Sequence, residues 1–326
     1  TYTGEGNTEV ELLGKKITLQ SQGGPEATTI DCEGLGRAFH IHEGETPETV
    51  LDGFSIVNGV APVSTYGPNN HEMSYGGGIF VDGANPTLRN LKISSSTANI
   101  GGGLTLRYSN APVTDVRIDG NSADYFGGGG VAFVYSNSHF ERVTITNNYA
   151  KDFGGGILYN TSHPTLNKVT IASNTAERFG FGSYTTIDYE DWSGQLPLSI
   201  TTSRPILTNC IVWNNDIDGW TWTMITPPWS LKNDVSVNYS NVQGGWEGVG
   251  NINSDPFFNT NFTLQAESPC INAGTSYFQW VEEELYDYND YNELDVIVSP
   301  DDVVVDMDFE QFEGSEPDMG ADESSH

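Results

Sequence analysis

The sequence predicts an all-β solenoid in which parallel strands stack coil upon coil, and three observations point to it. Glycine clusters recur at a nearly constant interval, beginning at Gly76, Gly101, Gly127 and Gly154, so that successive units hold 25, 26 and 27 residues. Within each unit, apolar and polar residues alternate, which is the pattern of a strand with one buried face. Only 17% of the 326 residues are charged and 37 are glycines, a composition that favours strands and turns over helices.

Each unit contains two or three short strands, and their apolar residues keep the same phase from unit to unit. One strand directly follows the glycines. A second strand is marked by three apolar positions per unit, which are Leu88, Leu91, Ile93; Val113, Val116, Ile118; Phe140, Val143, Ile145; and Leu166, Val169, Ile171. A unit of this size cannot bury an apolar face alone. We therefore expect coils of about 26 residues that stack at roughly 4.8 Å and share one core.

Asparagine recurs in phase with the glycine clusters, at Asn121, Asn148 and Asn174. On successive coils the side-chain amides can bond to one another in a ladder, and Asn also tolerates the left-handed conformation of turns. The glycine triplets are expected where the chain turns a corner tightly or where neighbouring backbones approach closely. Both features therefore predict architecture rather than a binding site.

Residues 16–275 resemble a known family through a set of short stretches. Those stretches include residues 17–21, 29–34 and 51–59, the glycine repeats, Asn209-Cys210-Ile211-Val212-Trp213-Asn214-Asn215, residues 239–242, Asp255-Pro256-Phe257-Phe258, Ser268-Pro269-Cys270-Ile271-Asn272-Ala273-Gly274 and Asp318-Met319-Gly320-Ala321-Asp322-Glu323. They are similar to secreted bacterial right-handed parallel β-helix proteins with polymorphic-outer-membrane-protein-like Gly-Gly repeats and a choice-of-anchor type C-terminal region. The resemblance implies a single-stranded, right-handed β-helix that is secreted or held at the bacterial cell surface, a fold that hosts many functions.

The sequence divides into a β-helix over residues 1–275 and an acidic C-terminal extension over residues 276–326, which we expect to pack on or cap the helix. Regular coils are expected over about 76–182. Loop insertions are expected at about 60–75, 183–204 and 216–232. The formal net charge is −31, and no Lys or Arg follows Lys232, so the 21 acidic residues beyond it carry most of that charge.

Aromatic residues gather in the last two insertions and form one candidate site. They are Tyr184, Tyr189, Trp192, Trp220, Trp222 and Trp229. Exposed aromatic rings of this kind stack on carbohydrate or anchor a protein interface. The alternative is that these loops fold back and cover the surface of the coils.

Acidic residues in the C-terminal extension form a second candidate site, for Ca²⁺. They are Asp287, Asn289, Asp290, Glu293 and Asp295. Calcium takes six to eight oxygen ligands from such clusters, although the spacing of an EF-hand is missing here. The alternative is a solvated acidic face. Residues 303–305, three valines between acids, predict an edge strand kept soluble by charge.

Three cysteines, Cys32, Cys210 and Cys270, have no neighbour at metal-site spacing. We expect buried small apolar side chains, with one long-range disulfide left open. The acidic composition argues against nucleic-acid binding, and no apolar stretch is long enough for a membrane span. A start at Thr1 rather than Met is typical of a mature or trimmed product.

Lyase and glycosidase signatures were not found, so the prediction leans away from an enzyme. The long-range charge would also repel pectate or alginate. We expect a non-catalytic structural or adhesive protein that acts outside the cell. Its expected partners are other copies of itself, joined end to end in filaments or a surface layer, or cell-surface components. The alternative is a polysaccharide-active, lyase-like β-helix enzyme, or a carbohydrate-binding module that uses the aromatic loops.

Overall fold

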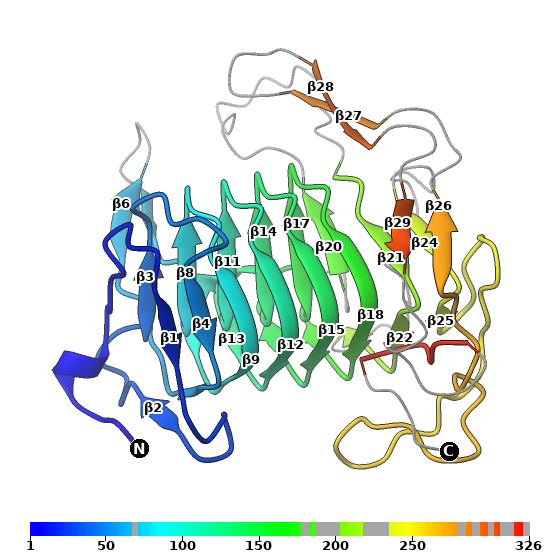
Figure 1. Cartoon of the computed structure of the whole chain (residues 1–326), viewed down its shortest axis with the longest axis horizontal. Helices are drawn as coiled ribbons and strands as arrows, with labels where there is room; N and C mark the ends of the chain where they lie inside the picture. The colour runs from blue at the N-terminus through cyan, green and yellow to red at the C-terminus, as the bar shows by residue number, and fades with distance from the viewer. Residues whose placement is uncertain are drawn as a thin grey trace.

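The computed structural model describes residues 1–66, 71–177, 183–186, 203–217, 235–279, 285–288, 294–298, 303–306 and 316–321. Over residues 1–275 the described part of the chain winds into a right-handed parallel β-helix, whose coils stack in chain order from residues 1–12 at one end to residues 243–275 at the other (Figure 1). The helix among them is a 3₁₀ turn, η1 (Glu5–Asn7), and it is far too short to cross a membrane. The predicted fold class is confirmed.

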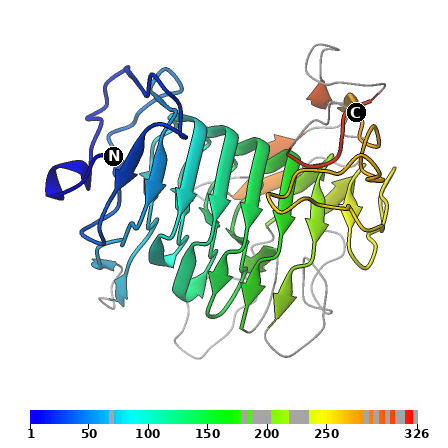
Figure 2. The same ribbon diagram turned by 90° about the horizontal axis from the view of Figure 1, so that it is seen from below.

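Three parallel sheets run along the axis, and their strands lie side by side in Figures 1 and 2. The long sheet has the order β1 (Thr18–Gln20), β4 (Val50–Asp52), β9 (Thr87–Ser94), β12 (Pro112–Asp119), β15 (His139–Thr146), β18 (Thr165–Ala172), β21 (Ile206–Thr208) and β24 (Ser236–Asn238), and it includes β2 (Thr29–Asp31), β5 (Ser55–Val57), β22 (Ile211–Trp213) and β25 (Asn241–Val242). The six-stranded sheet has the order β3 (Phe39–Ile41), β8 (Ile79–Asp82), β11 (Leu104–Arg107), β14 (Val131–Val134), β17 (Ile157–Asn160) and β20 (Ser183–Thr186). The five-stranded sheet has the order β10 (Thr97–Ile100), β13 (Ser122–Gly127), β16 (Tyr149–Ala150), β19 (Thr175–Ala176) and β23 (Asp216–Ile217).

The interior is filled by apolar side chains that stack in register from coil to coil. One row of the long sheet holds Leu88, Val113, Phe140 and Leu166, and another holds Ile93, Ile118, Ile145 and Ile171. Every member of both rows is at most 1% exposed. Alternate residues point outward, because side chains in a strand change face at each position. The predicted apolar sets therefore form one continuous core.

Each long strand bends at a residue in the left-handed conformation. Asn90, Asp115, Arg142, Lys168 and Asn209 occupy this corner on successive coils, with φ between 51° and 55°. Asn and Asp tolerate this conformation better than other non-glycine residues. Arg142 and Lys168 are held in it because the strands on both sides of the bend remain paired with the neighbouring coils.

The glycine triplets lie where neighbouring coils come closest, as predicted. A Cβ atom at Gly102 would collide with the carbonyl oxygens of Ser122 and Gly129, and the equivalent Gly129 is enclosed in the same way. The backbone N–H of Gly102 instead donates to the carbonyl of Gly128 on the next coil, at 3.0 Å. Glycine is required at these positions because no side chain fits between the coils.

The predicted asparagine ladder is also present. Nδ2 of Asn121 donates to Oδ1 of Asn148 at 3.0 Å, and Nδ2 of Asn148 donates to Oδ1 of Asn174 at 2.9 Å. Asn215 extends the ladder by accepting from Asn174 at 3.0 Å. Asn121, Asn148 and Asn174 are fully buried, so each amide satisfies a neighbour that could not reach water.

A second, smaller apolar layer covers the outer face of the six-stranded sheet. Its buried members are Ile100, Ala132, Val134 and Leu158, and Met73, Tyr75, Phe126, Tyr135 and Phe153 pack against them. Outward positions of this sheet, such as Phe80 and Thr105, are consequently buried. This layer explains why side chains on that face are shielded from solvent although they lie outside the coils.

The segments that leave the coils carry small antiparallel pairs. Within the expected insertion at 60–75, β6 (Ser64–Tyr66) pairs with β7 (His71–Met73). In the C-terminal extension, β26 (Tyr277–Gln279) pairs with β29 (Val303–Asp306), and β27 (Leu285–Tyr288) pairs with β28 (Leu294–Val298). The predicted valine strand is thus β29. β20 and β23 continue the regular sheets. Coil pairing therefore extends into the first residues of the insertions expected at 183–204 and 216–232.

The C-terminal end of the helix is covered by turns and by a returning segment. Residues 243–275 fold over the last coil, and residues 316–321 run back against β18 and β22. Ala321 N–H donates to Oγ1 of Thr170 at 3.0 Å, and Met319 joins a buried cluster with Leu264 and Cys270. All three cysteines are unpaired and buried, in agreement with the expectation of buried small side chains.

Candidate functional site

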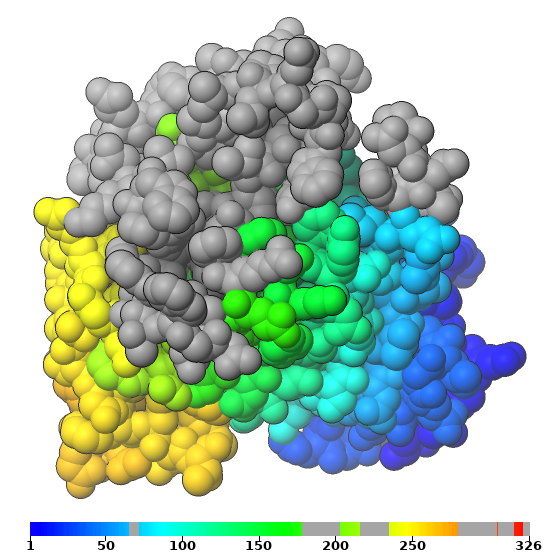
Figure 3. Space-filling model, turned by 180° about the vertical axis from the view of Figure 1, so that it is seen from behind, coloured from blue at the N-terminus to red at the C-terminus, as the bar shows by residue number. Residues whose placement is uncertain are grey.

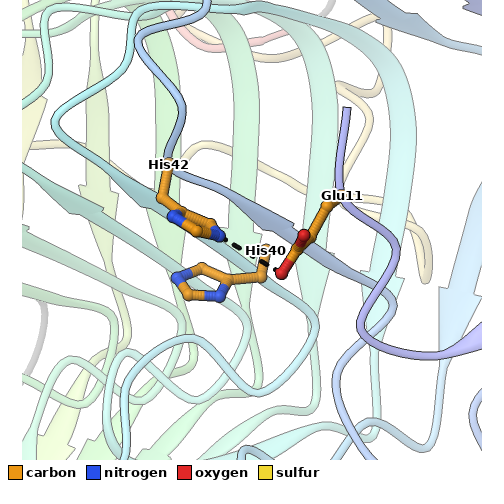
Figure 4. A group of neighbouring side chains, drawn as sticks. All are labelled: Glu11, His40 and His42. Atoms are coloured by element: carbon orange, nitrogen blue, oxygen red, sulfur yellow. Dashed lines mark hydrogen bonds and ion pairs between the residues drawn. The ribbon is translucent and has the colours of Figure 1, made fainter. Parts of the chain in front are cut away.

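Three ionisable side chains converge at the N-terminal end of the β-helix: Glu11, His40 and His42 (Figure 4). Nε2 of His42 lies 3.3 Å from Oε1 of Glu11. One possible ligand atom from each of the three side chains lies within 4.8 Å of the other two. Glu11 is exposed, whereas both imidazoles are partly buried. This Glu-His-His cluster is the only group of three such side chains within ligand distance among the described residues.

Strand geometry explains how the cluster forms. In β3, Phe39 and Ile41 point into the core and are at most 1% exposed, so His40 points outward. His42 follows two residues after His40 and shares its face. Glu11 arrives from the N-terminal segment, because Val10 forms a parallel bridge with Phe39 and its carbonyl accepts the N–H of His40 at 3.1 Å.

Aromatic stacking fixes the orientation of the inner imidazole. The ring of His40 stacks with that of His42 at 4.1 Å and with that of Phe80, on the next coil, at 5.0 Å between centroids. The guanidinium groups of Arg37 and Arg107 lie 5.2 and 5.1 Å from the centre of the Phe80 ring. The ring of Phe80 and the two guanidinium groups therefore pack beneath the cluster.

The charges around the cluster are arranged in pairs. Nε of Arg37 bonds to Oε1 of Glu9 at 3.1 Å, and Arg107 forms two bonds to the carboxylate of Asp82 at 2.7 and 2.6 Å. Burial, with smaller contributions from Arg37 and His42, lowers the pKa of His40 to about 4. His40 is therefore a neutral imidazole at physiological pH. Its Nε2 atom is buried and has no hydrogen-bond partner among the described residues.

A carboxylate also lies behind the outer imidazole. Oε1 of Glu43 is 3.6 Å from Nδ1 of His42, on the side of the ring opposite Nε2, which faces Glu11. At 3.6 Å the contact is too long for a hydrogen bond, so Glu43 acts on the His42 ring through its charge alone. Two imidazoles and a carboxylate are ligands for a divalent transition metal, and they also form stable ion pairs without one.

Sequence reasoning missed this cluster. The available signal was the pair His40 and His42, which lie two positions apart in a stretch that reads as a strand and thus share a face. Glu11 gives no local signal, because it lies 29 positions before His40 and only the winding of the first coil brings them together.

The same end of the molecule has an open sheet edge. β1 ends the long sheet, and it pairs with β4 on one side but with no described strand on the other. Leu13 and Ile17, which precede β1, are 55% and 41% exposed. Six of the eleven well-exposed large apolar side chains among the described residues fall within residues 1–63. This N-terminal edge therefore combines unpaired backbone groups with exposed apolar surface.

The predicted aromatic site falls almost wholly outside the described residues. This applies to Tyr189, Trp192, Trp220, Trp222 and Trp229. Tyr184 lies in β20, where its backbone is in register with Leu158 of β17. The carbohydrate or interface role of these residues stays a prediction.

The predicted calcium site is described only as backbone. Asp287 in β27 pairs in register with Asp295 in β28, whereas Asn289, Asp290 and Glu293 lie outside the described residues. Two of the five residues are therefore brought opposite each other by an antiparallel pair. The proposed binding of Ca²⁺ stays a prediction.

Basic side chains on the outer face of the long sheet are paired with carboxylates. Arg89 bonds to Asp52 at 3.0 Å, and Lys92 forms an ion pair with Glu26. Further along, Nε of Arg142 bonds to Oδ1 of Asp115 at 2.6 Å. The sheet therefore presents a charge-balanced surface rather than a cationic stripe.

Comparison with known proteins supports the fold and gives no function. Residues 69–221, just under half of the chain, match the family model described as the right handed beta helix region. Comparison with curated proteins and with solved structures gave no match. The family match and the coil topology together show a right-handed parallel β-helix fold built from repeated coils.

Proposed function

We propose that this protein is a non-catalytic structural or adhesive β-helix that works outside the cell or at the cell surface, and that it associates with a second copy through its N-terminal edge. The observation that carries the proposal is the open edge of β1, flanked by the exposed apolar residues Leu13 and Ile17. An unpaired strand edge is a template for adding another strand.

The body of the molecule suits a rigid support. The apolar core runs from coil to coil without interruption through β9, β12, β15 and β18, and the asparagine ladder continues through the turns after β12, β15, β18 and β22. The ion pairs on the outer face of the long sheet support a structural role over polyanion binding, because their positive charges are already neutralised. Carbohydrate binding by the aromatic loops is the alternative function.

The arrangement of the two ends favours pairing of like ends. Turns and a returning segment cover the C-terminal end, whereas β1 leaves the N-terminal end open. Two N-terminal edges can meet about a two-fold axis, since the same surface then contacts itself and the contact closes. A filament or surface layer would need a further contact beyond this closed pair.

Sedimentation velocity over a range of protein concentrations tests the proposal. We expect the chain to shift from monomer to dimer as concentration rises. The double variant Ile17→Lys, Thr18→Pro should stay monomeric, because it adds charge and removes a backbone N–H at the edge. Tyr125→Lys, at an exposed position on a middle coil, is the matched control and should dimerise normally. Monomers at all concentrations, or equal dimerisation of all variants, would refute the proposal.

A further inference from the structure

We propose that Glu11, His40 and His42 form a binding site for a divalent transition metal ion, best matched to Zn²⁺, that fastens the N-terminal segment to β3. The site is independent of the proposed dimer, because all three ligands come from one chain. The contacts in the cluster, the groups around it and the chemistry of its donors support the proposal.

The spacing of the donor atoms is close to that of a zinc site. Zinc binds imidazole and carboxylate at about 2.0–2.2 Å, so two ligands of a tetrahedral ion lie roughly 3.4 Å apart. Nε2 of His42 and Oε1 of Glu11 are already 3.3 Å apart. One nitrogen of His40 lies within 4.8 Å of a ligand atom of each of the other two residues, so rotation of exposed Glu11 and partly buried His42 would close the site.

The surroundings support ligation by both imidazoles. Oε1 of Glu43 lies 3.6 Å from Nδ1 of His42, and a small shift would complete the carboxylate–histidine hydrogen bond found behind zinc ligands. The ring of His40 is held between those of His42 and Phe80, which fixes its position beside Glu11. Nε of Arg37, which lies over the same Phe80 ring, is bonded to Oε1 of Glu9, so the charge of Arg37 is compensated.

The donor set separates this site from the acidic C-terminal extension. Two imidazoles with one carboxylate favour Zn²⁺ and similar ions, whereas carboxylates and carbonyls alone suit Ca²⁺ and Mg²⁺. Three protein ligands also leave a fourth position for water at the exposed rim of the cluster. Excess Ca²⁺ should therefore occupy acidic surfaces without displacing Zn²⁺ from the histidines.

A metal ion bound here would link the N-terminal segment to β3, at the end of the β-helix where a strand edge is open. Among the described residues, the N-terminal segment is joined to β3 through the Val10 bridge and the Glu9–Arg37 contacts. A metal bound by Glu11 and by both histidines would add a link between residues 9–11 and residues 40–42. Binding to the folded chain alone raises stability in proportion to the logarithm of metal concentration.

Isothermal titration of the chelator-treated full chain with ZnCl₂ in millimolar CaCl₂ tests the site. We expect one ion per chain. Glu11→Ala and His42→Ala, at the two more exposed ligands, should each weaken binding by on the order of 100-fold, and Glu43→Gln by about 10-fold. His139→Ala is the matched control, because His139 also lies near a carboxylate, Glu141 at 3.9 Å, but has no second histidine in ligand range among the described residues.

A spectroscopic readout keeps the proposal testable even if a variant alters folding. The electron paramagnetic resonance spectrum of the Cu²⁺-loaded chain should show two coordinated nitrogens, and one in His42→Ala. Absence of binding at roughly 0.1 mM Zn²⁺, a spectrum with oxygen ligands only, or binding that Glu11→Ala and His42→Ala leave unchanged would each overturn the site.

Discussion

The two ends of the β-helix differ in how much of the terminal coil is covered by other parts of the chain. At the C-terminal end, residues 243–275 and 316–321 place the buried cluster of Leu264, Cys270 and Met319 over the last coils (Figure 3 shows residues 243–275 in yellow and orange). At the N-terminal end, the bridges at Tyr2 and Val10 cover β2 and β3, while β1 keeps a free edge. The comparison teaches that covering chain buries the last coils at one end, whereas at the other end a strand edge stays open, and both proposed sites lie at this open end.

The largest expected difference between the ends is in stability. Met319→Ala removes a fully buried side chain from the C-terminal cluster and should cost about 2–5 kcal/mol of unfolding free energy. Leu13→Ala, at the exposed N-terminal edge, should change it by less than about 0.5 kcal/mol. Urea unfolding followed by circular dichroism measures both. Equal losses would mean that the two ends are equally well packed.

A buried lysine beneath the C-terminal segment should make that end sensitive to pH. Lys168 is fully buried, and burial, together with nearby Arg142, lowers its pKa to about 8, although Asp318 opposes the shift. The folded state then binds this proton more weakly than the unfolded state does. The destabilisation is therefore complete below pH 8 and disappears as pH rises past the unfolded pKa of roughly 10.4.

Lys168→Met should consequently stabilise the chain at neutral pH by up to about 3 kcal/mol. The gain should shrink between about pH 8 and 10.4, as measured by urea unfolding at each pH. Lys151→Met, at an exposed position, is the control and should show no such trend. A loss of stability in Lys168→Met at neutral pH would show that its contacts outweigh the cost of burial.

A smaller effect is expected where a single amide ties the C-terminal turns to the last coil. Nδ2 of Asn241 donates to the carbonyl of Ser254 at 2.7 Å and to Sγ of Cys270 at 3.1 Å, within the core. Asn241→Ala should cost about 1–3 kcal/mol, because it leaves buried partners unsatisfied. Hydrogen exchange should rise in residues 243–275. Asn7→Ala, which removes a solvent-facing bond in η1, should leave exchange there unchanged.

The smallest expected difference is in the rate at which cysteines react. Burial raises the pKa of Cys32 to about 12 and that of Cys270 to about 11, so neither thiol reacts in the folded state. Modification needs local opening, which should be more frequent near the thinly covered N-terminal coils. Iodoacetamide labelling, read by peptide mass spectrometry, should therefore modify Cys32 before Cys270. The reverse order would contradict the proposed contrast between the ends.

Much of the repeat was predictable because it depends on local pattern. Three patterns each mark a fixed position in the coil: the alternation at Leu91 and Ile93, the phase of Asn121 and Asn148, and the glycine triplets. Because each pattern repeats from coil to coil, it predicts the fold reliably. The Glu-His-His cluster was not predictable, since Glu11 reaches His40 only through the winding of the first coil. The burial of Lys168 depends on residues 316–321, about 150 positions away. No local sequence pattern predicts that this segment folds back against β18.

The coils differ in length, and the position of the extra residues shows where the chain tolerates an insertion. β10 and β13 pair at Ala98 with Ala123 and again at Ile100 with Gly127, so the later coil has two extra residues between the same two pairing points. The long sheet and the six-stranded sheet keep their registers on either side. This corner therefore accepts extra residues while the strands on either side of it stay in register. A peptide grafted between Asp124 and Tyr125, which are both exposed, would be displayed on the side of the coils, away from Phe126 and the apolar layer that it packs against.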